Sequence, residues 1–145
     1  MNLFANLEIR LKAHLAAMVA DGRLPEGLPI DRITVEPPRD ASHGDFATNA
    51  AMVLAKPAKT NPRALAEELV AEIAGWAEID GAEIAGPGFI NMRAKAEAWH
   101  GLLKGILGDG DGFGSSELGQ GKPVNVEYVS ANPTGPLHLG HARGA

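Results

Sequence analysis

The chain has 145 residues, 45% of them apolar and 21% charged, which is typical of one globular domain with a short appendage. It has no cysteine, which excludes disulfides, thiolate nucleophiles and Cys-based zinc sites, and no apolar run reaches the roughly 18 residues of a membrane span. The formal net charge of -5 argues mildly against nucleic-acid binding, which normally uses a basic surface.

The first predicted element is an amphipathic helix over residues 2–20, which ends at Asp21-Gly22. Its apolar positions recur at helical spacing: Leu3, Leu7, Leu11, Leu15 and Met18. Charged residues at positions 8, 10 and 12 interrupt this segment, so it is not a signal peptide, and we expect a soluble, cytoplasmic protein.

A short strand is predicted next, because Ile33 and Val35 alternate with polar residues before two prolines. Residues 43–46 then predict a loop that leads into a helix. Asp45 is its expected N-cap, 47–56 its body and Pro57 its end.

The following helix begins at Asn61-Pro62, a capping residue followed by proline at the first helical position. Its buried stripe is Leu65, Leu69, Ile73 and Trp76. The run of carboxylates around it, without Lys or Arg between Arg63 and Arg93, is typical of a solvated face.

Two strands, 79–85 and 89–93, are predicted on either side of Gly86-Pro87-Gly88. Strand alternation puts Phe89, Asn91 and Arg93 on one face and Ile90 and Met92 on the other. A last helix over 94–107 has four expected inward side chains: Trp99, Leu102, Leu103 and Ile106. This order of helices and short strands favours an α+β fold with a small antiparallel sheet over a parallel βαβ stack.

The chain is expected to divide into a domain over 1–108, a linker over 109–121 rich in Gly, Asp and Ser, and a second unit over 122–145. In the second unit, residues 124–129 predict a strand and Leu137 the opening of a helix.

His138, Gly140 and His141 form the motif with the clearest chemistry. Helix N-termini attract anions, a glycine lets a ligand approach the backbone, and two histidines three residues apart project to one side. Such a pair could donate to phosphate oxygens. The two histidines could equally be an ordinary surface or core pair. A zinc site is not favoured, because two histidines alone supply too few ligands for it.

A longer run around these histidines resembles the HIGH signature of class I aminoacyl-tRNA synthetases. The run is Ala131, Asn132, Pro133, Thr134, Gly135, Pro136, Leu137, His138, Leu139, Gly140 and His141. The flanking VNVEYVS and ARGA are similar to the arginyl enzymes of this class. HGDFATNAAMVLAK (43–56) and GPGFIN (86–91) resemble motifs of their N-terminal additional domain.

The resemblance implies the N-terminal part of an arginine-tRNA ligase, an enzyme that makes arginyl-adenylate from L-arginine and ATP, with magnesium, and transfers the arginine to tRNA(Arg). Residues 1–108 would be its tRNA-binding domain and 122–145 the first strand and loop of its Rossmann-type catalytic domain. We expect a monomer without a membrane partner or protein-bound metal. We also expect this piece alone to be inactive, because the rest of the nucleotide fold is not in it.

The resemblance also implies residue roles. His138 and His141 would be catalytic and would bind the ATP phosphates together with Gly140. Ser130 and Asn132 would hold the main-chain end of arginine. Glu127 would pair with the guanidinium, as a carboxylate can with two parallel N–H bonds; otherwise it is an exposed strand residue.

In the first domain the resemblance implies that Phe89 stacks on an unpaired tRNA loop base and that Asn91 hydrogen-bonds to it. The alternative is that Phe89 is a core residue and Asn91 a turn residue. Residues 43–45 are interpreted as turn and capping positions. Two other functions stay open: a stand-alone RNA-binding module, and a nucleotidyltransferase with the same histidine motif.

Overall fold

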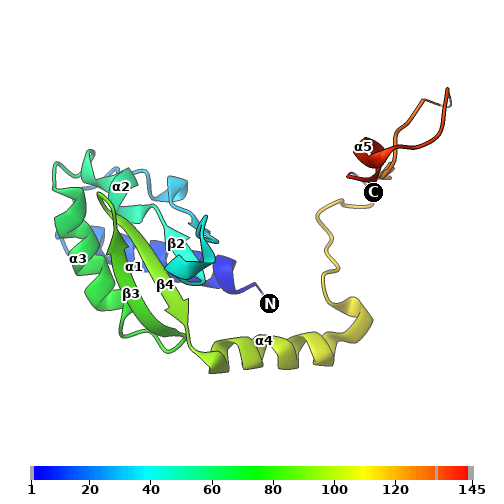
Figure 1. The fold of residues 1–145 in the computed structure, drawn as a ribbon. Coiled ribbons are helices and arrows are strands. Elements are labelled where there is room, and N and C mark those ends of the chain that lie inside the picture. Colours follow the sequence, from blue (N-terminus) through cyan, green and yellow to red (C-terminus); the bar gives the residue numbers. More distant parts are fainter. Residues whose placement is uncertain (1, 133, 144–145) are drawn as a thin grey trace. The chain divides into compact units, whose positions relative to one another are not determined.

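The computed structural model describes residues 2–132 and 134–143 (Figure 1). They divide into two compact units, of which the first ends at Gly110 and the second begins at Asp111. The first contains helices α1 (Leu3–Ala20), α2 (Ala50–Ala55), α3 (Pro62–Ile73) and α4 (Ala96–Asp109). Its strands are β1 (Val35–Glu36), β2 (Phe46–Thr48), β3 (Ile79–Ala85) and β4 (Phe89–Ala94). The predicted bounds 1–108, 109–121 and 122–145 stay a prediction.

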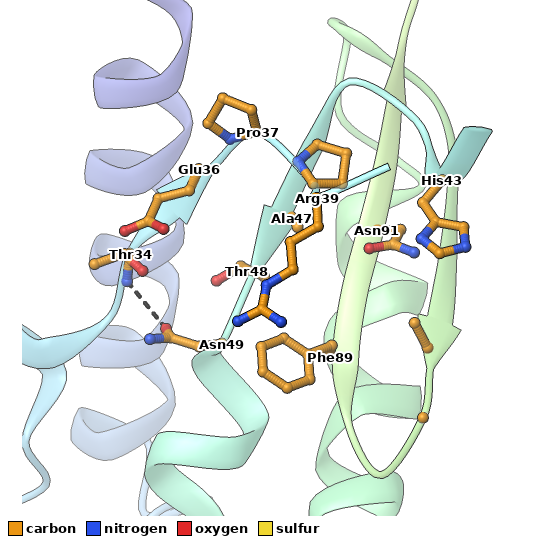
Figure 2. Close-up of a pocket in the computed structure, with 13 residues that line it drawn as sticks. Thr34, Glu36, Pro37, Arg39, His43, Ala47, Thr48, Asn49, Phe89 and Asn91 are labelled. Atoms are coloured by element: carbon orange, nitrogen blue, oxygen red, sulfur yellow. Dashed lines mark hydrogen bonds between the residues drawn. The ribbon is translucent and has the colours of Figure 1, made fainter. Parts of the chain in front are cut away.

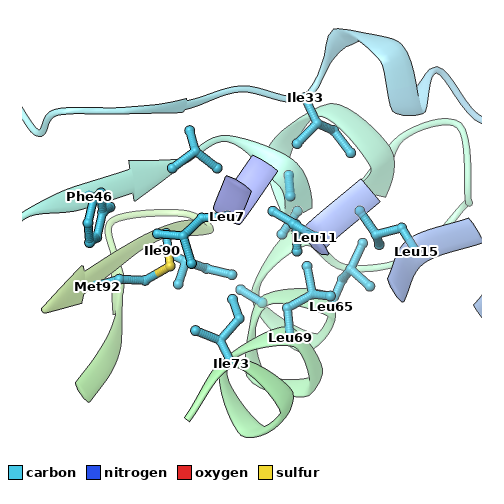
Figure 3. Close-up of a cluster of buried hydrophobic side chains, with 14 of the residues drawn as sticks. Leu7, Leu11, Leu15, Ile33, Phe46, Leu65, Leu69, Ile73, Ile90 and Met92 are labelled. Atoms are coloured by element: carbon cyan, nitrogen blue, oxygen red, sulfur yellow. The ribbon is translucent and has the colours of Figure 1, made fainter. Parts of the chain in front are cut away.

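Helices α1 and α3 follow the sequence prediction. The Asn2 side chain caps α1 by accepting from the Ala5 N–H at 3.3 Å, and Gly22 follows its end with a φ of +72°. Asn61 caps α3 by accepting from the Arg63 N–H at 2.8 Å. The apolar stripes of both helices are buried in one core with Ile90 and Met92 (Figure 3).

The four strands form one sheet in the order β1-β2-β4-β3, and every pairing is antiparallel. The predicted α+β fold with a small antiparallel sheet is therefore confirmed. Phe46 lies opposite Met92, and Thr48 lies opposite Ile90. All four are buried, so this face, called the inner face, packs on the helices.

The predicted helix over 47–56 with Asp45 as its N-cap is wrong at its start. Residues 46–48 are instead the strand β2 between β1 and β4, and α2 begins only at Ala50, after the N-cap position Asn49. The reason is that Phe46 and Thr48 reach the core in extended backbone. Thr48 Oγ1 then accepts from the Ala50 N–H at 3.3 Å.

The predicted inward face of the last helix is also wrong in part. None of the α4 residues is buried, and Trp99 and Leu103 are 37% and 53% exposed. Leu102 packs partly on the core, and the Trp99 ring stacks on Phe46 with centroids 5.9 Å apart. The helical period predicts an apolar stripe, but it does not tell how much of the stripe meets a partner.

In the second unit the structure contains the short helix α5 (Leu139–Ala142). Residues 124–129 form no strand here, and Val124, Val126 and Tyr128 are 76%, 61% and 71% exposed. Because a strand exists only through pairing with a neighbour, the first strand of a Rossmann-type sheet stays a prediction. No helix in residues 2–132 and 134–143 has the length and apolarity to cross a membrane.

Candidate functional site

A pocket of about 630 Å³ lies on the face of the sheet opposite the helices (Figure 2). We call it the sheet pocket. It is lined by Thr34, Glu36, Pro37, Pro38, Arg39, His43, Ala47, Thr48, Asn49, Ala85, Gly86, Phe89 and Asn91. Phe89 and Asn91, the two residues predicted to contact tRNA, are among them.

Strand register places these two residues side by side. Asn91 pairs with Ala47 on β2 and Glu83 on β3, and Phe89 pairs with Ala85. Residues two apart on one strand share a face, as the sequence predicted. The methyl side chains of Ala47 and Ala85 fill little space, which leaves room above the sheet.

The structure disagrees with the alternative that Phe89 is a core residue and Asn91 a turn residue. Phe89 is 43% exposed and absent from the core, whereas Phe46 on the neighbouring strand is 1% exposed. Asn91 lies within β4 rather than in a turn and is 5% exposed. Asn91 lines the pocket, and among the described residues no protein group hydrogen-bonds to its side-chain amide, so a donor and an acceptor are available to a ligand.

The segment that leads into β2 is fixed to β4. The Asp45 N–H donates to Met92 O at 2.9 Å, and Arg93 Nη2 donates to Ser42 O at 3.2 Å. Gly44 has a φ of +113°, and a Cβ there would lie 2.6 Å from Met92 O, so only glycine fits. The interpretation of this segment as a turn agrees with its geometry.

The same segment has a capping carboxylate at its start. Asp40 accepts from the Ser42 N–H at 2.9 Å at the beginning of the 3₁₀ turn Ala41–His43. This backbone hydrogen bond lowers the pKa of Asp40 below its usual value. His43, the last residue of this turn, and Arg39, which precedes Asp40, both line the pocket.

Arg39, Thr48 and Asn49 line the pocket and were not predicted as site residues. Asn49 accepts from the Thr34 N–H at 3.0 Å, which joins the β2–α2 junction to the residue before β1. Recognition of β2 as a strand would have placed Thr48 and Asn49 near β4, because it pairs 46–48 with 90–92, but it would not have placed Arg39.

The histidine motif lies in the second unit, where His138 is the N-cap of α5. His138 Nδ1 accepts from the Gly140 N–H, and His141 Nδ1 accepts from the His138 N–H, both at 3.1 Å. The rings stack with centroids 3.8 Å apart. Nδ1 of each ring is thus engaged within the motif, which leaves Nε2 as the ring nitrogen that a ligand can contact.

Gly140 is tightly placed beside this pair, since a Cβ there would lie 2.9 Å from His138 Cε1. A pocket of about 580 Å³ is lined by both histidines and by Val129, Leu137, Leu139 and Ala142. The three predicted arginine-binding residues, Glu127, Ser130 and Asn132, do not line it and are exposed. Pro133 of the signature lies outside the described residues.

Comparison with known proteins decides the family. The model of the family described as "Arginyl tRNA synthetase N terminal domain" matches residues 5–94, which include β1 to β4 and the sheet pocket. This chain belongs to the arginyl-tRNA synthetase N-terminal domain family. The resemblance seen in the sequence is thereby confirmed.

Relatives of this chain bear the name arginine-tRNA ligase. One from Ruegeria sp. (strain TM1040) is 59% identical over 145 residues, which are 100% of this chain and 25% of the relative. Another, from Nitrobacter hamburgensis, is 58% identical over 144 residues, 99% of this chain and 24% of the relative. The chain therefore spans about a quarter of the length of these relatives.

A solved structure has the same fold. The arginyl-tRNA synthetase of Thermus thermophilus matches 99% of this chain and 21% of its own, with a TM-score of 0.51 and 24% sequence identity.

Proposed function

We propose that this chain is the N-terminal part of an arginine-tRNA ligase, a class I enzyme that activates L-arginine with ATP and transfers it to tRNA(Arg). The observation that carries the proposal is the 59% identity over the whole chain with a relative of that name. The chain retains the complete HIGH-type run 131–141. Translation takes place in the cytoplasm, which is the location we assign.

The first unit supplies a tRNA contact at the sheet pocket. Phe89 offers a half-exposed ring for stacking, and Asn91 offers an amide donor and an acceptor for a base edge. An unpaired loop base has both a free face and a free edge, which a paired base lacks. Stacking supplies about 1 to 3 kcal/mol per base, so a single aromatic contact is significant despite the net charge of -5.

The second unit supplies part of the adenylate site. The Nε2–H groups of His138 and His141 donate to ATP phosphate oxygens as these gain charge, and Gly140 lets the nucleotide approach the backbone. Ser130 and Asn132 hold the main-chain end of arginine, and Glu127 pairs with its guanidinium. Magnesium accompanies ATP as part of the substrate.

Arginine-dependent exchange of pyrophosphate into ATP, measured with tRNA(Arg) present, tests this function. The complete protein that contains this chain is expected to catalyse it, and the 145-residue chain alone is expected not to. Exchange that requires no amino acid would favour a nucleotidyltransferase. Absence of exchange, together with tRNA binding, would favour an RNA-binding module, and either result would overturn the proposal.

A further inference from the structure

Arg39 is a cation at the sheet pocket that the function above does not use. It is exposed and lines the pocket, and Figure 2 shows its side chain extending from the loop toward Thr48 and Phe89. Within residues 2–132 and 134–143, no carboxylate lies within salt-bridge distance of its guanidinium.

Four of the five other arginines of the first unit have a partner, and the fifth, Arg32, does not line the pocket. Their partners are Glu78 for Arg10 at 2.9 Å, Glu68 for Arg23 at 3.2 Å, Glu67 for Arg63 at 3.6 Å, and the Ser42 carbonyl for Arg93 at 3.2 Å. In a chain with net charge -5, carboxylates are plentiful, yet none meets Arg39 among the described residues. Glu36, the acidic residue that lines the pocket, lies at its β1 side, away from Phe89 (Figure 2).

The backbone on both sides of Arg39 is restrained. Pro37 and Pro38 precede it and have a fixed φ, and Asp40 after it caps the 3₁₀ turn that Arg93 ties to β4. Because the backbone is already restrained, only the side chain of Arg39 loses conformational entropy when its guanidinium binds an anion. Guanidinium groups match phosphate oxygens with two parallel N–H bonds.

We infer that Arg39 binds a backbone phosphate of the RNA next to the nucleotide whose base stacks on Phe89. The sheet pocket is then a site for a whole nucleotide: Phe89 and Asn91 contact the base and Arg39 contacts the phosphate. This inference rests on the proposed tRNA contact of the first unit and adds a charged partner to it.

The salt dependence of tRNA binding tests the inference, because each lost phosphate contact lowers the slope of log K against log salt by about 1. Binding of tRNA(Arg) transcript to the complete protein is measured over a series of KCl concentrations. Arg39→Ala is expected to weaken binding roughly 3- to 10-fold at low salt and to make the negative slope shallower by about 1. Arg39→Lys, which keeps the charge, is expected to keep the slope.

Two further variants make the result decisive. Arg32→Ala removes another exposed arginine that does not line the pocket, and it is expected to change neither affinity nor slope. Phe89→Ala is expected to weaken binding without changing the slope. If Phe89→Ala weakens binding and Arg39→Ala leaves the slope unchanged, the Arg39 inference is overturned and the proposed tRNA contact stands. If neither variant affects binding, both are overturned.

Discussion

The Asp45 carboxylate accepts a hydrogen bond from the backbone N–H of Ala94 at 2.8 Å. A residue just before β2 is thereby joined to the last residue of β4, and its own N–H donates to Met92 O at 2.9 Å. These two bonds set where the loop over 37–45 leaves the sheet. The loop at the sheet pocket therefore depends on the side chain of Asp45, which the sequence predicted to cap a helix instead.

Asp45→Ala is expected to destabilise the protein by about 1 to 3 kcal/mol, because it leaves the half-buried Ala94 N–H without its acceptor. Asp45→Asn keeps an oxygen in the same place, so its free energy of unfolding should fall clearly less than that of the Ala variant. Chemical denaturation of the three proteins measures this. Equal stability of the Ala variant and the wild type would show that water replaces the carboxylate.

Gly44→Ala is expected to cost about 2 to 5 kcal/mol, because its positive φ disfavours a side chain and a Cβ would clash with Met92 O. Gly22→Ala is the matched control. Gly22 also has a positive φ, of +72°, but an added methyl group would meet no atom within 4 Å, so the cost should be about 1 kcal/mol. Similar unfolding free energies for both variants would mean that the loop moves freely away from β4.

Glu8 links α1 to the edge strand β1 in a pH-dependent way. It accepts from Lys12 Nζ at 2.7 Å and from the Val35 N–H at 3.2 Å. The Lys12 hydrogen bond lowers the pKa of Glu8 below its ordinary value of 4.5, with further lowering by the Val35 N–H and the Lys12 charge, while partial burial acts in the opposite direction.

A lowered pKa in the folded state means that the carboxylate stabilises the protein above pH 4.5 and that this contribution is lost as pH falls through the lowered value. Glu8→Gln should therefore cost about 1 kcal/mol or less near pH 7, since the pair is partly exposed and screened. The unfolding free energies of wild type and variant should converge below pH 4.5. A difference that persists at acid pH would assign the effect to packing.

His138→Ala or His141→Ala in the complete protein should slow arginyl-adenylate formation by roughly 10²-fold or more, as loss of a preorganised donor does. His100→Ala, on the exposed surface of α4, is the control and should leave the rate unchanged. Pre-steady-state formation of the adenylate gives the rate. Near-normal rates in both motif variants would remove these histidines from the mechanism.

The sequence predicts the elements whose signals are local. The Leu3 to Met18 stripe defines α1, the Asn61-Pro62 start defines α3, and residues 86–88 define the turn between β3 and β4, and the structure has all three. Each signal is contained within a few turns of helix or one hairpin. Pairing partners far along the chain are not needed to recognise them.

The strand β2 could not be predicted in this way. The alanine-rich run after Asp45 suits a helix, and its first three residues become a strand only because Phe46 finds Met92 as its partner. For the same reason Phe89 and Asn91 could be placed on one face of a strand from alternation alone, whereas Arg39 could not be placed beside them. The place of Arg39 in the pocket depends on the loop that crosses to β4 through Gly44 and Asp45.

The central claim is that the sheet pocket contacts tRNA through Phe89 and Asn91. Phe89→Ala or Asn91→Ala in the complete protein should raise the KM for tRNA(Arg), by roughly 5-fold or more for the loss of about 1 kcal/mol or more of stacking. The KM for ATP should stay at its wild-type value, because the residues predicted to bind ATP belong to the second unit and these two belong to the first.

Phe113→Ala is the matched control, since Phe113 is 39% exposed, close to the 43% of Phe89, and does not line the sheet pocket. Melting curves establish that each variant is folded, and Phe89→Ala should cost only about 1 kcal/mol because the ring is half exposed. The account predicts a raised KM for tRNA in both pocket variants, with normal values in the control. Folded Phe89→Ala and Asn91→Ala proteins that aminoacylate tRNA(Arg) with a wild-type KM would contradict it.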